Sequence, residues 1–454
     1  MRFLPILLLA GWFVPAASAA PNRHVVLITI DGFPAYLFHD PKASLPNIRQ
    51  LAAQGVEAEG MRVSSPSVTW PNHTTIVTGV NPARHSVLYN GVLELGGPGL
   101  PVKIDPNRDK ADLVAVPTIY DRLHAAGFRT AAINWPCTRN VTTLDDNFPD
   151  VPDNLANTTP RLRQELVARG VLASESDAAF DQLSGAARDE VWVQAACEVI
   201  RRRKPHLLYL HLLNTDGVHH RYGPSSPASY TAIALADAYV GRLLGALDEA
   251  GIRSKTTVFV TADHGFATAT NVLHPNVLLR RAGLLQLGAS NQIVSARAQV
   301  VPEGGMGMVY LTNPATRDED RRKVLELFEG QEGVARVLQP VDYAAYGFPL
   351  PDRNRRMSDL VIAAKDGYAV AGIATGENFV NPAGRQTNLG YHGYLADNPR
   401  MNATLVVAGR GIKRGAKIGM VSNLDLAPTV ARLLGQTLPN VDGEVLAEIL
   451  DSGK

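Results

Sequence analysis

Val25-Val26-Leu27-Ile28-Thr29-Ile30-Asp31-Gly32 is the segment that decides the fold class of this chain. An unbroken run of apolar and β-branched residues is typical of a strand buried on both faces, as in a parallel sheet covered by helices. The strand ends at Asp31, and in open parallel sheets ligands bind beyond the carboxyl ends of the strands. The segment therefore predicts an α/β architecture with a polar side chain at its functional edge.

The same pattern, an apolar strand that leads into an Asp, occurs twice more. We expect strands at 207–213 and 256–260, which lead to Asp216 and Asp263. Further strands are expected at 130–134 and 403–409, and helices at 46–54, 117–126, 189–202, 229–250 and 426–434. This alternation predicts a mostly parallel central sheet flanked by helices. Between residues 266 and 386 the pattern weakens, which indicates an inserted smaller subdomain, and 145–185 is expected to be a surface excursion of helical character.

Length and charge exclude several classes of protein. The 454 residues carry 44 Lys and Arg against 43 Asp and Glu, a formal net charge of +1. That balance gives no reason to expect binding to a nucleic-acid duplex or an acidic membrane. Cys137 and Cys197 are the only cysteines, too few for a cysteine-based metal site. Either a disulfide or two free buried thiols fits them.

The N-terminus has the pattern of a targeting signal. Met1-Arg2 precedes an apolar run over 3–14 and then small residues, Ala16-Ala17-Ser18-Ala19-Ala20. A positive start, a short apolar core and an Ala-x-Ala end predict a cleaved signal peptide over 1–20, with an uncleaved anchor as the alternative. No later segment reaches the length of a membrane span. We therefore expect residues 21–454 to form the catalytic domain of an exported protein, periplasmic or secreted.

A second segment, Ser65-Pro66-Ser67-Val68-Thr69-Trp70-Pro71-Asn72-His73-Thr74-Thr75, predicts the start of a helix. Thr69 stands where an N-cap is expected, and Pro71 falls in the first turn, where its missing N–H costs nothing. The unpaired N–H groups and the helix dipole there favour a bound phosphate or an ionised oxygen. An ordinary threonine cap is the alternative interpretation.

Carboxylates and imidazoles elsewhere could hold metal ions. Asp216 and His220 are four apart and face one side of a helical turn, Asp263-His264 lies at a strand end, and His392 is in a Gly-rich loop. With Asp31 these are enough for two ions, and mixed carboxylate and imidazole ligands suit Zn²⁺ or a neighbouring transition metal better than Ca²⁺ or Mg²⁺. The remaining histidines are interpreted as structural, namely His24, His39, His73, His85, His124, His206, His211, His219 and His274.

Five motifs occur in a characteristic order along the chain. They are Ile30-Asp31-Gly32, Thr69-Trp70-Pro71-Asn72-His73, the segment from Asp216 to Pro224, Ala262-Asp263-His264-Gly265 and His392-Gly393-Tyr394. In these motifs the sequence resembles the nucleotide pyrophosphatase/phosphodiesterase family of the alkaline phosphatase superfamily. The resemblance implies an alkaline phosphatase-like fold.

The resemblance also implies roles for individual residues. Thr69 would be the nucleophile, and Asn90 would match the family's Asn that hydrogen-bonds a phosphoryl oxygen. One zinc ion would be held by Asp31, Thr69, Asp263 and His264, and the other by Asp216, His220 and His392. Trp70 replaces a frequent Phe, as a stacking face for a nucleobase or as plain packing. His219 stands where the family usually has Gly, and spacing favours His220 over it as the ligand.

These features predict an exported, metal-dependent hydrolase that cleaves phosphodiester or nucleotide pyrophosphate bonds through a phospho-Thr69 intermediate. Its partner would be a small phosphodiester or nucleotide, and its oligomeric state stays open. A threonine hydroxyl is a poor nucleophile until a metal lowers its pKa. A phosphomonoesterase, a phosphonate hydrolase or a non-catalytic exported binding protein are the alternatives. A monoesterase needs additional cations near the nucleophile, and Arg139, the candidate, does not fit that pattern.

Overall fold

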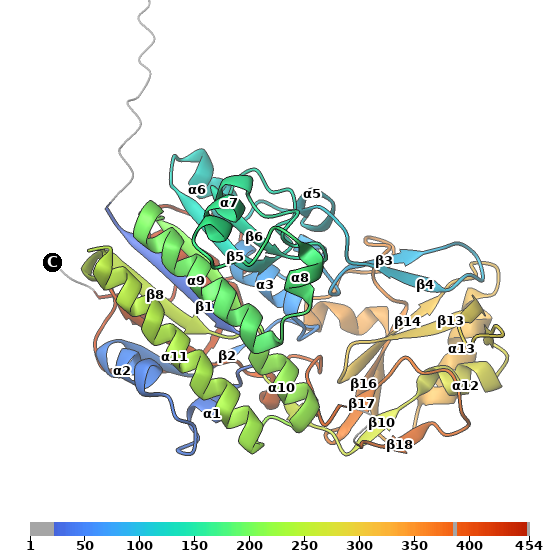
Figure 1. The fold of residues 1–454 in the computed structure, drawn as a ribbon. Coiled ribbons are helices and arrows are strands. Elements are labelled where there is room, and N and C mark those ends of the chain that lie inside the picture. Colours follow the sequence, from blue (N-terminus) through green and yellow to red (C-terminus); the bar gives the residue numbers. More distant parts are fainter. Residues whose placement is uncertain (1–21, 385–387, 452–454) are drawn as a thin grey trace, which may run out of the picture.

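The computed structural model describes residues 22–384 and 388–451 (Figure 1). The predicted signal peptide over 1–20 lies outside the described residues. Within those two ranges, no helix has both the length and the apolar character needed to cross a membrane.

An eight-stranded sheet with strand order β21-β2-β20-β8-β1-β7-β5-β6 forms the centre of the molecule. Its strands are β1 (His24–Ile30), β2 (Val56–Arg62), β5 (Thr130–Pro136), β6 (Asp146–Asp150), β7 (Leu207–Leu212), β8 (Thr256–Thr261), β20 (Leu405–Gly409) and β21 (Ala416–Ser422). Only β20 runs antiparallel to its neighbours, and the other pairs are parallel. The prediction of a mostly parallel central sheet is confirmed.

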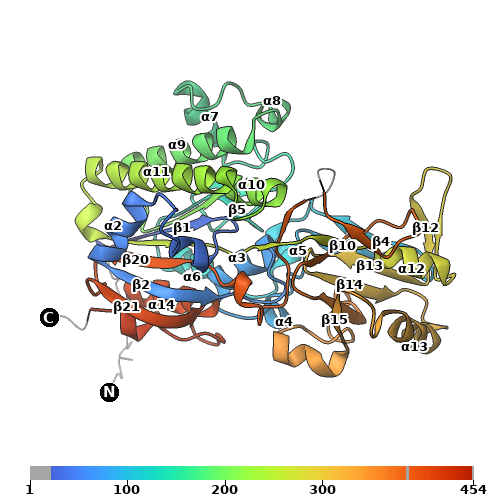
Figure 2. The same ribbon diagram turned by 90° about the horizontal axis from the view of Figure 1, so that it is seen from below.

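Helices cover both faces of this sheet (Figure 2). One face carries α2 (Pro46–Gln54), α9 (Gly185–Arg203), α10 (Asn214–Tyr222) and α11 (Pro227–Glu249), and the other carries α3 (Thr69–Thr78), α6 (Ile119–Ala125) and α14 (Leu426–Leu433). Further helices are α1 (Ala35–Phe38), α4 (Pro82–His85), α5 (Lys110–Leu113), α7 (Pro160–Ala168) and α8 (Asp177–Asp181). Because both faces are covered, every residue of β1, β7 and β8 is buried.

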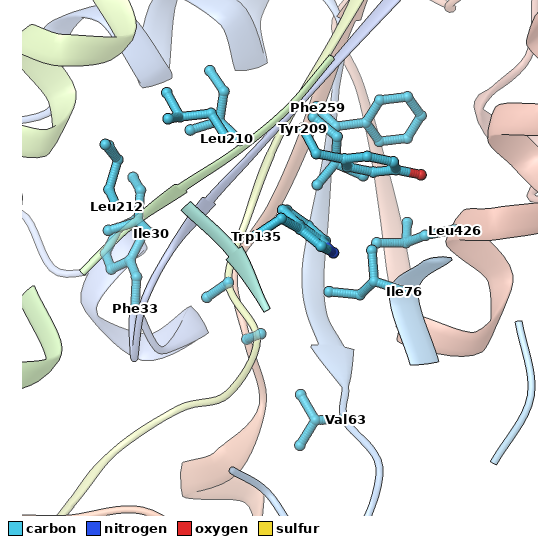
Figure 3. Close-up of a cluster of buried hydrophobic side chains, with 14 of the residues drawn as sticks. Ile30, Phe33, Val63, Ile76, Trp135, Tyr209, Leu210, Leu212, Phe259 and Leu426 are labelled. Carbon is cyan, nitrogen blue, oxygen red and sulfur yellow. The ribbon is translucent and has the colours of Figure 1, made fainter. Parts of the chain in front are cut away.

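The core lies between the sheet and these helices (Figure 3). Ile30, Leu210 and Phe259 extend from the central strands, while Ile76 and Leu426 come from the helices of one face. Trp135 on β5 is fully buried among them. The apolar runs that predict the strands are therefore the residues that form the core.

Three sheet strands were not expected. β2 and β21 carry alternating polar residues, so they lack the continuous apolar run by which the central strands are identified. β6 lies inside 145–185, where only a helical excursion is predicted, and its sequence Asp146-Asn147-Phe148-Pro149-Asp150 is polar. It is the edge strand of the sheet, where a proline is tolerated. The prediction for 145–185 is wrong in this part.

A second lobe lies beside the central sheet, at the right in Figure 1. It contains an antiparallel sheet of β13 (Ala298–Pro302), β14 (Met306–Leu311), β16 (Leu360–Ala364) and β15 (Val334–Leu338), the strands β17 (Tyr368–Val370), β10 (Asn271–Leu273) and β18 (Val380–Pro382), and helices α12 (Pro275–Arg281) and α13 (Arg317–Phe328). Smaller pairs are β11 (Leu285–Leu287) with β12 (Ile293–Ala296) and β9 (Ala267–Thr268) with β19 (Gly390–Tyr391). The hairpin of β3 (Val92–Leu95) and β4 (Val102–Asp105) packs its Leu93 and Val102 into this lobe beside Met306 and Met308. The limits 266 and 386 of the inserted subdomain stay a prediction.

Candidate active site

The site lies where the central strands end. β1 is paired with β7 on one side and β8 on the other, so their carboxyl ends share one edge of the sheet. Asp31 follows β1, Asp263 and His264 follow β8, and α10 with Asp216 and His220 follows β7. The Gly32 N–H donates to Oδ1 of Asp263 at 3.2 Å, which ties the two strand ends together.

Six predicted ligand side chains meet at this edge. Oδ1 of Asp216 lies 3.4 Å from Nε2 of His220 and 3.6 Å from Nε2 of His392. Nε2 of His264 lies 3.3 Å from Oδ1 of Asp31 and 3.2 Å from Oδ2 of Asp263. Ligand atoms of Asp31, Asp216 and His264 lie within 4.8 Å of one another, so Asp216 connects the two groups.

All three imidazoles are oriented in the same way. Nδ1 of His220 lies 2.9 Å from the Gly390 carbonyl, Nδ1 of His264 lies 3.1 Å from that of Gly265, and Nδ1 of His392 lies 2.9 Å from that of Ser67. A carbonyl only accepts hydrogen bonds, so each Nδ1 carries the proton. Each Nε2 is then a free lone pair directed at the carboxylates. This is the arrangement of histidines that bind metals in proteins.

The residues present fit a metal centre. Among the described residues, Asp31 Oδ1, Asp216 Oδ1, Asp263 Oδ2 and His264 Nε2 are buried without a hydrogen-bond partner. Buried polar atoms are normally paired, so four unpaired ones gathered where the central strands end call for an explanation. All four are electron-pair donors when deprotonated, so a cation is the kind of partner that would fit them.

Electrostatics lead to the same conclusion. Burial, and then the charges of Asp263 and Asp216, raise the pKa of Asp31 well above its ordinary value. Burial raises the pKa of Asp263 to about 7 and lowers that of His264 to about 4. The protein alone therefore disfavours the carboxylate charges of Asp31 and Asp263 and an imidazolium at His264.

Thr69 is the first residue of α3 and is 7% exposed. Val68 is the N-cap, so the expected N-cap position of Thr69 is wrong by one residue. The helix start is held by Asn90, whose Oδ1 accepts from the Trp70 N–H at 2.8 Å. This bond uses Oδ1 of Asn90 as an acceptor, so Nδ2 is the atom with which Asn90 could donate a hydrogen bond.

Trp70 is nearly enclosed. It is 5% exposed and packs against an apolar cluster with Val87, Val92, Leu113, Cys137 and Val151. This burial favours packing over nucleobase stacking. Cys137 and Cys197 are both buried free thiols, and burial raises the pKa of Cys137 to about 12 and that of Cys197 to about 11.

Two histidines interpreted as structural lie directly behind the site. Nε2 of His211 is 2.9 Å from Oδ2 of Asp31, and its Nδ1 is 2.9 Å from the Asn134 carbonyl. Nε2 of His73 is 2.8 Å from Oγ1 of Thr29. The sequence offered one sign that His211 supports the site: it stands inside the apolar run of β7, where a buried polar side chain needs a hydrogen-bond partner.

A family model for type I phosphodiesterase / nucleotide pyrophosphatase matches residues 25–395. The chain belongs to this family. The match covers the strand ends, α3, α10 and the loop that carries His392, so the resemblance seen in the motifs is confirmed.

Individual members of the type I phosphodiesterase family are distant in sequence. The chain is 24% identical over 246 residues to ectonucleotide pyrophosphatase/phosphodiesterase family member 3 of Rattus norvegicus, which is 53% of this chain and 24% of the rat protein. It thus spans about a quarter of that relative. It is 23% identical over 433 residues to bis(5'-adenosyl)-triphosphatase of Xenopus laevis, which is 93% of this chain and 80% of the relative. An inactive threonine-to-alanine variant of murine ectonucleotide pyrophosphatase/phosphodiesterase 5, in complex with AMP, superposes with a TM-score of 0.71 at 18% identity, over 94% of this chain and 100% of the murine one.

The type I phosphodiesterase motif contains two adjacent histidines here, and the structure gives them different surroundings. His219 is fully buried, with Nδ1 at 3.1 Å from the Gly32 carbonyl and Nε2 at 2.7 Å from Oγ of Ser229. Both of its nitrogens are therefore engaged away from the carboxylates. His220 instead directs Nε2 at Asp216.

Proposed function

We propose that this protein is an exported hydrolase that cleaves phosphodiester or nucleotide pyrophosphate bonds through a covalent phospho-Thr69 intermediate, with two zinc ions. The observation that carries the proposal is the orientation of His220, His264 and His392, each with Nε2 free and directed at a carboxylate. Family membership supports the reaction class, and the predicted signal peptide supports export.

The residues assigned to the metals follow the two groups at the sheet edge. Asp31, Thr69, Asp263 and His264 would hold one ion, and Asp216, His220 and His392 the other. When bound, such ions lower the pKa of a coordinated hydroxyl or water and neutralise charge on the entering and leaving oxygens of a phosphoryl group. Zinc suits the mixture of imidazole and carboxylate donors.

The chain's own residues then perform the displacement. The Oγ1 atom of Thr69 attacks phosphorus and the bond from phosphorus to the leaving oxygen breaks, while the hydroxyl proton passes through solvent to that leaving alkoxide or phosphate. The Nδ2 of Asn90 donates to a non-bridging oxygen, and N–H groups at the start of α3 add a fixed positive potential. A water molecule then attacks phosphorus, the bond from phosphorus to Oγ1 breaks, and one proton of that water restores the Thr69 hydroxyl as the phosphorylated product leaves.

Diesters suit this site better than monoesters. A monoester dianion needs additional cations, yet Nε of Arg139 is 3.2 Å from Oδ1 of Asp109 and is already paired. Asn90 is a neutral donor, matched to the single charge of a diester. The Xenopus relative is named for a dinucleoside triphosphate, and the murine variant holds AMP, which supports a nucleotide substrate.

A paired assay tests the proposal. Purified enzyme loaded with zinc is given the nitrophenyl ester of thymidine monophosphate, bis-p-nitrophenyl phosphate or nitrophenyl phosphate, with and without chelator. We expect diester hydrolysis that chelator abolishes and that exceeds monoester hydrolysis.

The nucleophile is tested with two variants of one position. Thr69→Ala should lower kcat by at least about 1000-fold with an unchanged circular dichroism spectrum, because the hydroxyl proposed to attack phosphorus is removed. Thr69→Ser keeps a hydroxyl and should retain measurable turnover and a phosphoserine that mass spectrometry detects. Wild-type turnover by Thr69→Ala contradicts the covalent mechanism.

A further inference from the structure

The loop that carries His392 is held from two sides. On one side it contacts the segment before the nucleophile, and on the other it contacts Gly304 and Gly305 of the second lobe. Neither contact is local in sequence. The position of His392 is therefore a product of how the two lobes meet.

Ser67 makes the contact on the nucleophile side. Its carbonyl accepts from Nδ1 of His392 at 2.9 Å and from the Gly393 N–H at 3.0 Å. Its own hydroxyl donates to the Tyr394 carbonyl at 2.6 Å. Ser67 lies two residues before Thr69. These three hydrogen bonds therefore connect the segment before Thr69 to the loop that carries His392.

The second lobe makes the contact on the other side. The Gly305 N–H donates to the His392 carbonyl at 2.7 Å. A Cβ atom on Gly305 would lie 2.1 Å from Cγ of Tyr394, and one on Gly304 would lie 2.3 Å from the His392 carbonyl oxygen. The Tyr394 hydroxyl donates to the Tyr368 carbonyl at 2.7 Å, on β17 of the same lobe. Only a residue without a side chain permits this close approach.

The second set of predicted ligands, Asp31, Asp263 and His264, is held in place by the central sheet. Asp31 and Asp263 lie one and two residues after the ends of β1 and β8, which are neighbours in the central sheet, and both are 0% exposed. His264 is also 0% exposed and binds the carbonyl of its own neighbour, Gly265. By contrast, Asp216 and His220 stand on α10 and are partly exposed, as is His392. One group is thus built into the sheet, and the other is assembled from a helix and a loop.

From these contacts we infer that Gly305 and Tyr394 are positioning residues for His392. The ion held by Asp216, His220 and His392 depends on the second lobe, whereas three of the four residues assigned to the other ion, Asp31, Asp263 and His264, are held at the ends of the central strands. The inference rests on the two-metal assignment of the proposed function. It predicts two sites of unequal strength, with the one at His392 the weaker.

The test measures zinc directly. Wild-type protein, Gly305→Ala and Tyr394→Phe are dialysed against buffered zinc, and bound zinc is counted by elemental analysis and titrated against a chromophoric chelator. Gly305→Ala should retain one equivalent of zinc where the wild type holds two. Tyr394→Phe keeps the ring and loses only the bond to Tyr368, so it should weaken the weaker site alone, by about 10-fold or more, the usual effect of losing a group that supports a ligand.

Gly245→Ala is the matched control, because a Cβ there meets nothing within 4 Å. It should bind both ions as the wild type does. Gly305→Ala that binds two equivalents with wild-type affinity overturns the inference, and so does a folded Gly305→Ala that loses both equivalents. If Gly305→Ala does not fold, an unchanged weaker site in Tyr394→Phe overturns it. A wild-type enzyme that binds no zinc instead overturns the two-metal assignment itself.

Discussion

At the scale of single residues, the adjacent histidines His219 and His220 on α10 make different contacts. His219 joins the Gly32 carbonyl to Ser229 and so links β1, α10 and α11, while His220 directs its free Nε2 at Asp216. A helical turn rotates by about 100° per residue, so neighbours face different surroundings. His219 therefore stabilises the fold, and His220 is available to bind a metal.

Two substitutions separate these tasks. His219→Gln should lower the free energy of unfolding by about 1–3 kcal/mol, because a buried hydrogen-bonding group loses its partner, and it should leave both zinc equivalents bound. His220→Gln should release one equivalent and leave the stability of the metal-free protein nearly unchanged. Zinc content and denaturation in the presence of chelator provide the two readouts. The reverse pattern would identify His219 as the ligand.

At the scale of elements, α10 depends on a carboxylate from another helix. The N-cap of α10 is Leu213, which has no capping side chain. Asp189 of α9 supplies the missing acceptor, with Oδ1 at 2.8 Å from the Leu213 N–H and Oδ2 at 3.2 Å from the Asn214 N–H. These bonds set the start of the helix that carries Asp216. Burial raises the pKa of Asp189 to about 7, although the two N–H bonds lower it in part.

This pKa predicts a pH dependence of stability. The unfolded chain releases the Asp189 proton near pH 4, whereas the folded protein keeps it up to about pH 7. Between these values the folded state binds more protons, so the stabilisation is complete below pH 4 and is lost as pH rises through 7. At 1.36 kcal/mol per pKa unit the loss is at most about 4 kcal/mol. Denaturation from pH 4.5 to 7.5 gives the free energy of unfolding of the wild type and of Asp189→Asn. The excess of the wild-type value over that of Asp189→Asn should shrink as pH rises. A difference that does not vary with pH contradicts this assignment.

At the scale of the whole molecule, like charges are gathered where the central strands end. Asp31, Asp216 and Asp263 lie around His264, and burial, followed by repulsion between the carboxylates, raises the pKa of Asp31 and Asp263. Cations that bind only the folded state relieve this repulsion and stabilise the fold by mass action.

Zinc should therefore raise the melting temperature of the entire chain. At a free zinc concentration 100 times the dissociation constant, one site contributes about 2.7 kcal/mol to the free energy of unfolding. Calorimetry with increasing zinc should show a rising melting temperature, and chelator should reverse it. Asp263→Asn, which removes one charge from the cluster, should raise the melting temperature of the metal-free protein and reduce the rise with zinc. A melting temperature that zinc leaves unchanged would count against a metal centre.

The sequence by itself determined the central strands, the helices between them and the family. Those features depend on local pattern, because β1, β7 and β8 are continuous apolar runs that only a doubly covered sheet can bury. It also predicted Asp31, Asp216, His220, Asp263, His264 and His392 as ligands, and the structure brings these side chains together. Their roles as ligands stay predictions for the zinc measurements above.

Tertiary structure alone decided what holds these side chains in place. β2 and β21 join the sheet through pairing with strands distant in sequence, and the polar β6 joins it through pairing with β5, none of which local polarity reveals. The support of Asp31 by His211 spans 180 residues, and the hydrogen bond from His392 to Ser67 spans 325. No local pattern specifies such a partner. The distances and directions of these atoms exist only once the two lobes have packed against each other.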